Sequence, residues 1–137
     1  MRLWHVDILP FLPRSQLLAQ WRELNSIFKK QDNHILINYI YDYQQVYLWE
    51  YAMAVVLEMK KRGYTIRSMD NSKNYFGVDF TIPKEIKGLT RFQEHNDEYF
   101  EICYYNLKEK YLRGQKDYTD AMWFALDEFY KEMMKSE

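Results

Sequence analysis

The sequence predicts an all-α fold: a compact single-domain bundle of about four helices that spans residues 1–137 and contains a long irregular middle loop. Apolar side chains recur every three or four positions in four separate stretches, which is the spacing of one face of a helix. The stretch richest in β-branched and aromatic residues, 31–43, lacks the alternation of a strand and is expected to form an irregular connection. A chain of this length, with 47% apolar residues, is long enough to bury a core.

The first helix is expected over about residues 13–29, after a loop bracketed by Pro10 and Pro13. Its apolar stripe consists of residues spaced four, three and four apart: Leu17, Trp21, Leu24 and Phe28. Arg22 lies next to this stripe, and Glu23 follows about 100° further round the helix. The two charged residues therefore border one rim of a helix that faces the core.

The second helix is expected over about residues 44–62, where apolar residues again follow the helical spacing: Leu48, Tyr51, Ala52, Val55, Val56 and Met59. Gly63 comes directly after three basic residues and stands where a glycine commonly ends a helix. The following stretch, 64–92, has no helical period and holds clusters of Asn, Asp, Gly and Pro, so it predicts the middle loop. A loop of that length in a small domain is often functional.

A third helix is expected within residues 95–112, capped by Asn96 or Asp97 and broken by Arg113-Gly114. Five of its residues share one face by spacing: Tyr99, Ile102, Cys103, Asn106 and Leu107. Cys103 is the single cysteine of the chain, which excludes an internal disulfide and a multi-cysteine zinc site. We expect it to be a small core residue.

A fourth helix is expected within residues 118–134, begun by Thr119 or Asp120, with five residues along one face: Met122, Ala125, Leu126, Phe129 and Met133. This helix belongs to an acidic half of the chain. Residues 1–67 hold nine basic and six acidic side chains, a balance of +3, whereas residues 68–137 hold ten and fourteen, a balance of −4. The neutral total and the pI near 6.3 give little support for a nucleic-acid binder unless basic residues cluster in three dimensions.

Other features of the sequence limit where the protein acts and which groups it binds. The N-terminus lacks the basic and apolar regions of a signal peptide, and no uncharged apolar run approaches the roughly 18 residues of a membrane span. We therefore expect a soluble cytoplasmic protein that does not bind membranes. His5, His34 and His95 lie far apart with no metal-ligand spacing, and phosphate-binding glycine loops are absent, so neither a metal nor a cofactor is expected.

Two short stretches carry a resemblance to a known family. Residues 1–24 resemble the N-terminal region of the pyrimidine dimer DNA glycosylases of the endonuclease V type, where a helix ends in Tyr-Arg-Glu-Leu and this chain has Trp21-Arg22-Glu23-Leu24. The stretch Met59–Tyr64, MKKRGY, is similar to the family's Leu-Lys-Arg-Gly-Phe at the end of its long helix. The resemblance covers the first 28 residues well and 46–66 moderately. It implies a DNA repair enzyme with DNA glycosylase and AP lyase activity on pyrimidine dimers or related damage in double-stranded DNA.

The resemblance also implies a set of site residues. In the family an N-terminal amine is the nucleophile, and α-amino groups have an ordinary pKa of about 7.7 to 8.0, so an appreciable fraction is unprotonated near neutral pH. Because Arg2 is too bulky for ordinary methionine removal, Met1 is expected to stay and to supply that amine. Glu23 is then the catalytic carboxylate that stabilises positive charge on the sugar and moves protons, and Arg2 and Arg22 are the DNA-binding contacts to phosphate.

This chain departs from the family pattern at several positions. Gln16 stands where the family has a histidine, Asn25-Ser26 lacks a family arginine, and an acidic helix replaces the family's aromatic, lysine-rich C-terminal tail. Two alternatives therefore stay open. One is a non-catalytic nucleic-acid or protein-binding module with the same fold, and the other is an enzyme that acts on a different base lesion or a nucleotide.

Overall fold

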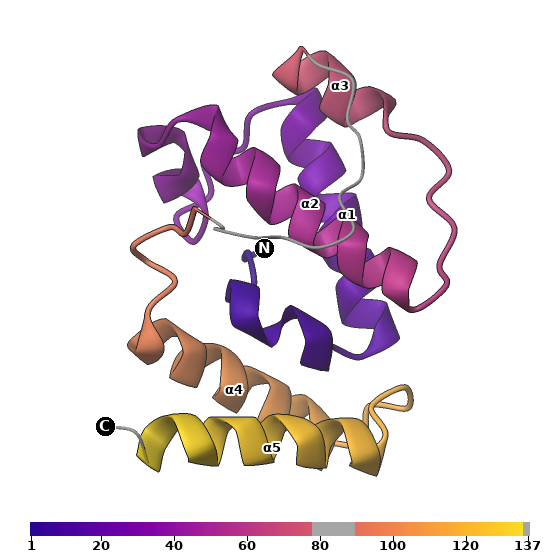
Figure 1. The fold of residues 1–137 in the computed structure, drawn as a ribbon, viewed down its shortest axis with the longest axis vertical. Coiled ribbons are helices and arrows are strands. Elements are labelled where there is room, and N and C mark those ends of the chain that lie inside the picture. Colours follow the sequence, from indigo (N-terminus) through magenta and orange to yellow (C-terminus); the bar gives the residue numbers. More distant parts are fainter. Residues whose placement is uncertain (78–89, 136–137) are drawn as a thin grey trace. The chain divides into compact units, whose positions relative to one another are not determined.

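The computed structural model describes residues 1–77 and 90–135, and this part of the chain is helical throughout, without a strand. The elements in chain order are η1 (Val6–Phe11), α1 (Arg14–Lys29), η2 (Asn38–Asp42), α2 (Gln45–Lys61), α3 (Asp70–Phe76), α4 (Asp97–Leu112) and α5 (Asp120–Lys135). The predicted all-α class is confirmed, and α1, α2, α4 and α5 are the four expected helices (Figure 1). Residues 78–89 of the predicted middle loop lie outside the described residues.

Contacts along the chain divide it into two units. Unit 1 comprises residues 1–3 and 18–92, and unit 2 comprises residues 4–17 and 93–137. Helix α1 starts in unit 2 and continues in unit 1. The single-domain boundary at 1–137 stays a prediction.

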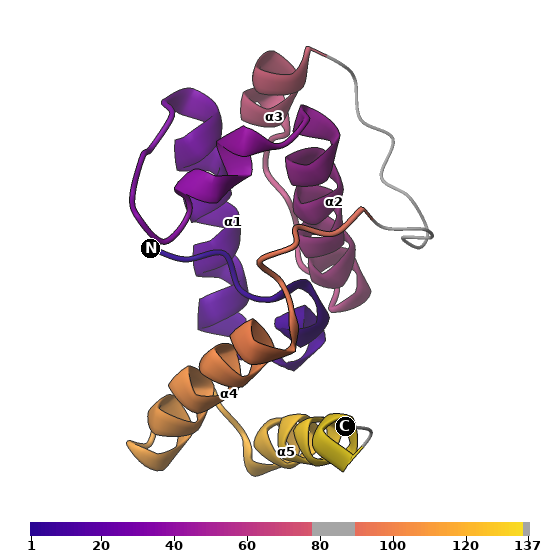
Figure 2. The same ribbon diagram turned by 90° about the vertical axis from the view of Figure 1, so that its left-hand side faces the viewer.

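Unit 1 is built on α2, whose predicted apolar face is buried throughout: Leu48, Tyr51, Ala52, Val55, Val56 and Met59 are each at most 3% exposed. The short helix α3 was not expected, since it lies inside the predicted loop. It lies beside the end of α1 (Figure 2). There the Phe28 ring packs against the rings of Tyr75 and Phe76, whose centroids are each 5.3 Å from its own. Aromatic pairs at this separation explain why a seven-residue helix with few helix-forming residues is held in place.

The buried stripe of α1 differs from the expected one at one position. Leu17, Leu24 and Phe28 are buried as predicted, but Trp21 is partly exposed. The polar residue Gln20 is fully buried instead. The stripe is therefore rotated slightly from the predicted line, and an indole that was expected in the core faces a groove described below.

The ends of α2 and α4 follow the sequence closely. Gly63 and Gly114 have positive φ angles of 79° and 83°, which residues with a Cβ atom rarely adopt. After each glycine the chain turns back on the helix: Tyr64 N–H donates to the Met59 carbonyl at 2.9 Å, and Gln115 N–H donates to the Lys110 carbonyl at 3.0 Å. These are Schellman-type ends, and they satisfy carbonyls that a helix end leaves unpaired.

Within unit 2, η1, α4 and α5 all contact one another (Figure 1). The side chain of Asn96 accepts the Tyr99 N–H at 2.9 Å and so caps α4, as predicted. The buried face of α4 is not the expected one, because Ile102 is 45% exposed and Asn106 is also exposed. Buried instead are Phe100, Cys103, Tyr104 and Leu107.

A column of aromatic rings joins α4 to α5 and explains this shift of the buried face. Tyr104 stacks on Tyr130 with centroids 3.9 Å apart and also on Trp123 at 5.3 Å, and Trp123 in turn stacks on Tyr111 at 5.2 Å. Because Tyr104 must lie at the centre of the column, α4 turns that side toward α5. On α5, Trp123 and Leu126 are buried, whereas Ala125 and Phe129 of the predicted face are exposed.

None of the helices that the structure describes is long and apolar enough to cross a membrane. Within residues 1–77 and 90–135, no group of three or more His, Cys, Asp or Glu side chains is arranged to hold a metal ion.

Candidate functional site around helix α1

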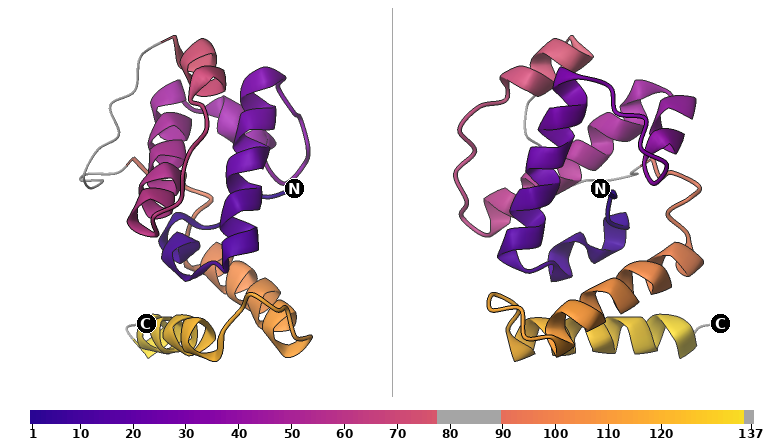
Figure 3. Two further views of the ribbon diagram at one scale, coloured as in Figure 1. Left: turned by 90° about the vertical axis from the view of Figure 1, so that its right-hand side faces the viewer. Right: turned by 180° about the vertical axis from the view of Figure 1, so that it is seen from behind.

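The chain's first residues lie beside α1 within unit 1 (Figure 3). A buried glutamine holds them there. The Gln20 Nε2 donates to the main-chain carbonyl of Arg2 at 3.2 Å and to the Glu23 Oε2 at 3.2 Å. One side chain therefore ties the peptide that follows Met1 to the carboxylate of Glu23.

The Glu23 carboxyl is in an unusual electrostatic environment. It is partly buried, and this loss of solvent raises its pKa above the usual range. The positive charge of the N-terminus and that of Arg22 both act on the carboxyl in the opposite direction and lower its pKa. The N-terminal amine therefore lies close enough to Glu23 for their charges to interact, while water is partly excluded from the carboxyl.

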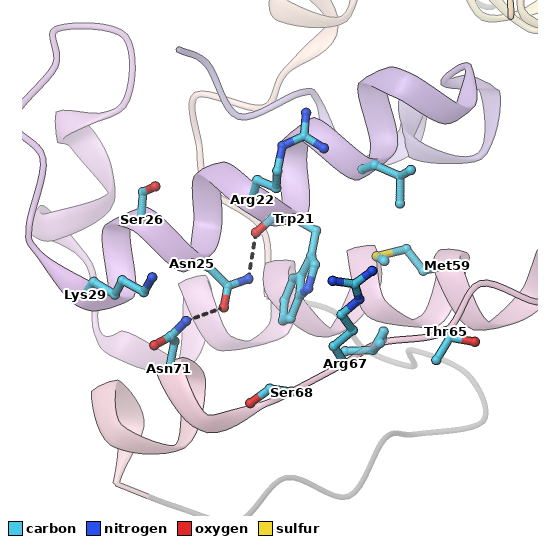
Figure 4. A pocket seen from close by; sticks show the side chains of 12 residues that line it. Trp21, Arg22, Asn25, Ser26, Lys29, Met59, Thr65, Arg67, Ser68 and Asn71 are labelled. Atoms are coloured by element: carbon cyan, nitrogen blue, oxygen red, sulfur yellow. Dashed lines mark hydrogen bonds between the residues drawn. The ribbon is translucent and has the colours of Figure 1, made fainter.

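A groove of about 670 Å³ lies along the neighbouring face of α1 (Figure 4). Six of its lining residues come from α1 and the others from α2, from the stretch after it and from α3: Leu18, Trp21, Arg22, Asn25, Ser26, Lys29, Met59, Thr65, Ile66, Arg67, Ser68 and Asn71. Three of these side chains are cationic and none is acidic. Together with the Trp21 indole and the neutral polar groups, they form a surface suited to an anionic ligand that carries flat rings.

Two asparagines fix the wall between α1 and α3. The Asn25 Nδ2 donates to the Trp21 carbonyl at 2.8 Å, and the Asn71 Nδ2 donates to the Asn25 Oδ1 at 3.0 Å (Figure 4). Because the Trp21 carbonyl can only accept, the Asn25 nitrogen must face it and the Asn25 oxygen must face Asn71. The groove is thus held by side chains whose orientations are determined by their partners.

Arg22 is the residue that the two features share. It is exposed, it lines the groove, and its charge acts on Glu23. Met1, Arg2 and Glu23 are not among the lining residues of the groove. The N-terminus and the Glu23 carboxylate therefore lie on one side of α1, and the cationic groove lies on the adjacent side. Arg22 lies at the border between the two sides.

The charge of the two units differs in sign. By sequence, unit 1 holds twelve Lys and Arg against eight Asp and Glu, and unit 2 holds seven against twelve. The balances are +4 and −5. The near-neutral total therefore conceals a basic unit, and it is the unit that contains the N-terminus, Glu23 and the groove.

All four residues predicted for the site lie in unit 1: Met1, Arg2, Arg22 and Glu23. The sequence did not nominate Gln20, Lys29, Arg67 or Asn71. Gln20 had a usable signal, since it lies three residues after Leu17 and four before Leu24 and is thus a polar residue within an apolar stripe. Arg67 and Asn71 had none, because their place beside α1 depends on the fold of the predicted loop.

Other histidines and tyrosines pack against neighbouring aromatic rings. His5 and His95 are both buried in unit 2, with stacked rings 5.5 Å apart. Tyr39 and Tyr43 pack edge-on against the ring of Phe92, with ring centroids 5.4 and 4.9 Å away.

A family model described as pyrimidine dimer DNA glycosylase matches residues 1–72, which is more than half of the chain and includes every residue of the site and the groove. No curated protein and no solved structure matches the chain.

Proposed function

Because the chain belongs to the pyrimidine dimer DNA glycosylase family, we propose that it removes damaged bases from double-stranded DNA and nicks the strand through an imine formed by its N-terminal amine. The observation that carries this proposal is the Gln20 side chain, which donates to both the Arg2 carbonyl and the Glu23 carboxylate and so ties the N-terminal peptide to that carboxyl group. An amine nucleophile and a carboxyl group in one partly dry site are the two groups that such chemistry needs.

The reaction begins with the unprotonated α-amine of Met1. Its nitrogen attacks the sugar C1′, the bond from C1′ to the base breaks, and the base leaves with the bonding electrons. The nitrogen then loses a proton, the bond from C1′ to the ring oxygen opens, and that oxygen takes up a proton. The product is an imine between the protein and the sugar. Loss of a 2′ proton breaks the C3′–O bond by β-elimination and so nicks the strand.

Glu23 serves these steps in two ways. As a carboxylate it stabilises the positive charge that develops on the sugar and then on the imine. As a group whose pKa is raised by burial, it holds a proton at a higher pH than an ordinary glutamate and can pass that proton to and from the sugar oxygen. Desolvation therefore supports its role as a proton shuttle.

Arg22 and the groove are proposed to hold the DNA. A guanidinium binds phosphate through a planar pair of donors, so exposed Arg22 is suited to the backbone next to the sugar that reacts at Glu23. Lys29 and Arg67 extend this positive surface along α1, and Arg2 adds a cation beside the amine. This arrangement explains how a chain with a pI near 6.3 can bind DNA.

Reduction by borohydride tests the proposal, since it converts an imine into a stable amine and leaves the protein attached to the DNA. We expect a covalent complex when the protein with a native N-terminus is mixed with a duplex that contains an abasic site. A peptide tag placed before Met1 moves the amine away and is expected to abolish the complex. Failure of the untagged protein to form the complex contradicts the proposal.

The alternative function is a binding module that keeps the family's fold without its chemistry. The acidic balance of unit 2 favours it, because a net charge of −5 opposes DNA binding by that part of the chain. It predicts salt-dependent DNA binding by the untagged protein without a trapped complex.

A screen of duplexes with different base lesions then identifies the substrate, because an enzyme for another lesion forms a trapped complex on abasic DNA but does not release pyrimidine dimers.

A further inference from the structure

Gln20 is a fully buried amide on a face of α1 that is otherwise apolar, with Leu17, Leu24 and Ile27 around it. A buried amide is costly unless its donors and acceptor are paired. A leucine at this position buries more easily, so packing alone does not explain the glutamine. Its hydrogen bonds do suggest a purpose.

Three hydrogen bonds fix the orientation of the Gln20 side chain. The Arg2 carbonyl can only accept, so the amide nitrogen must face it, and the second N–H of the same nitrogen points to the Glu23 Oε2. The amide oxygen then faces α2, where it accepts the hydroxyl of Tyr51 at 2.9 Å. Tyr51 is only 2% exposed. The amide cannot flip without placing like groups against each other.

We propose that Gln20 is a positioning residue, which is anchored by Tyr51 and holds the N-terminal peptide and the Glu23 carboxylate at a fixed separation. This inference rests on the proposed function, because it assigns a purpose to the contact between those two groups. Both bonds from the Gln20 nitrogen are 3.2 Å long, one to the Arg2 carbonyl and one to the Glu23 carboxylate.

The consequence concerns the rate of imine formation rather than DNA affinity. A free N-terminus samples many conformations, and a misplacement of about 1 Å can lower a rate by about 100-fold. Gln20 is buried and lies away from the lining of the groove, so its loss leaves the three groove cations, Arg22, Lys29 and Arg67, in place. A residue with this role affects the chemical step at saturating DNA and leaves the dissociation constant unchanged.

Two substitutions remove the network in different ways. Gln20→Met keeps nearly the same shape and removes all three hydrogen bonds, and Tyr51→Phe removes only the hydroxyl that anchors the amide. Matched controls come from the same unit. Gln31→Met changes an exposed glutamine, and Tyr41→Phe removes a hydroxyl that bonds with the main chain of Asp32 at 2.8 Å.

The experiment measures the single-turnover rate of borohydride trapping on abasic duplex DNA at saturating protein, and separately the dissociation constant for the same duplex. We expect Gln20→Met to lower the rate by about 10- to 100-fold and Tyr51→Phe to lower it by about 3- to 10-fold, each with a dissociation constant within about twofold of the wild type. Both controls are expected to keep the wild-type rate. Thermal unfolding of each variant checks that it is folded.

The outcomes separate this inference from the function beneath it. If the wild type traps DNA and both network variants trap it at the wild-type rate, Gln20 does not position the site, although the proposed function stands. If the variants lose affinity and rate in proportion, the network is only structural and the inference is wrong. If Gln20→Met does not fold, the rate for Tyr51→Phe decides. A wild type that forms no complex overturns the proposed function and this inference together.

Discussion

The cationic surface along α1 predicts how DNA binding depends on salt. Four side chains are proposed to meet phosphates: Arg2, Arg22, Lys29 and Arg67. Each neutralised phosphate releases counterions and contributes about −0.9 to the slope of log affinity against log salt, so four contacts predict a slope of about −3.6. Affinity for duplex DNA is then expected to fall by about 150-fold between about 50 and about 200 mM salt.

The double variant Lys29→Ala/Arg67→Ala removes two of the three groove cations and keeps Arg22, which borders the proposed catalytic residues Met1 and Glu23. It leaves two contacts, so the slope is expected to become about −1.8 and the loss of affinity over the same salt range about 12-fold. Fluorescence anisotropy with a labelled duplex at several salt concentrations measures both quantities. Lys30→Ala/Lys61→Ala is the matched control, because both of these lysines are exposed in the same unit and neither lines the groove.

The control is expected to keep the wild-type slope. A double groove variant whose slope equals that of the wild type places the DNA elsewhere on the protein and refutes the reasoning. A control variant that lowers the slope as much as the groove variant shows that any basic residue of unit 1 contributes equally, and the groove is then not the DNA-binding surface.

Three further predictions concern stability. Because burial raises the pKa of Glu23, the folded protein binds a proton on this carboxyl more tightly than the unfolded chain does, and it loses stability as pH rises. Glu23→Gln is therefore expected to raise the free energy of unfolding near pH 7. Chemical denaturation at several pH values measures this gain, which is expected to disappear below about pH 4. Tyr104 donates to the Asp127 carboxylate at 2.5 Å and lowers the pKa of that carboxyl. Tyr104→Phe is therefore expected to lower the free energy of unfolding by about 1 kcal/mol at neutral pH, and by less as the pH falls through that lowered pKa. An equal loss in acid contradicts the assignment. Leu107 is fully buried, so Leu107→Ala is expected to lower the free energy of unfolding by about 2 to 5 kcal/mol. If residues 1–137 are one domain, probes in both units report the same shifted unfolding transition. A shift confined to unit 2 contradicts the single domain.

The sequence predicted the helix ends well because they depend on single residues with local effects. Gly63 and Gly114 adopt the positive φ that ends a helix, and Asn96 accepts a main-chain N–H at the start of α4. Helix faces were predicted less well, because they depend on the partner. On α4, Tyr104 stacks with Tyr130 and Trp123, and the buried face turns toward Tyr104 and leaves the predicted Ile102 exposed.

The candidate site divides in the same way. Arg22 and Glu23 are neighbours in sequence and could be picked out by their register from the N-terminus. The groove could not be predicted, because Asn71 lies on α3 and Arg67 just before it, and this helix forms inside a stretch rich in turn residues. That helix is stabilised by Phe28 against its aromatic residues, a tertiary contact that local propensity does not contain.

The identity of the nitrogen that joins the DNA tests the central claim most directly. The protein with its native N-terminus is trapped on abasic duplex DNA with borohydride and digested, and mass spectrometry then locates the modified residue. We predict that the adduct lies on the α-nitrogen of Met1 and that no lysine carries it. An adduct on a lysine side chain, such as that of Lys29 in the groove, contradicts the mechanism even though the strand is cut.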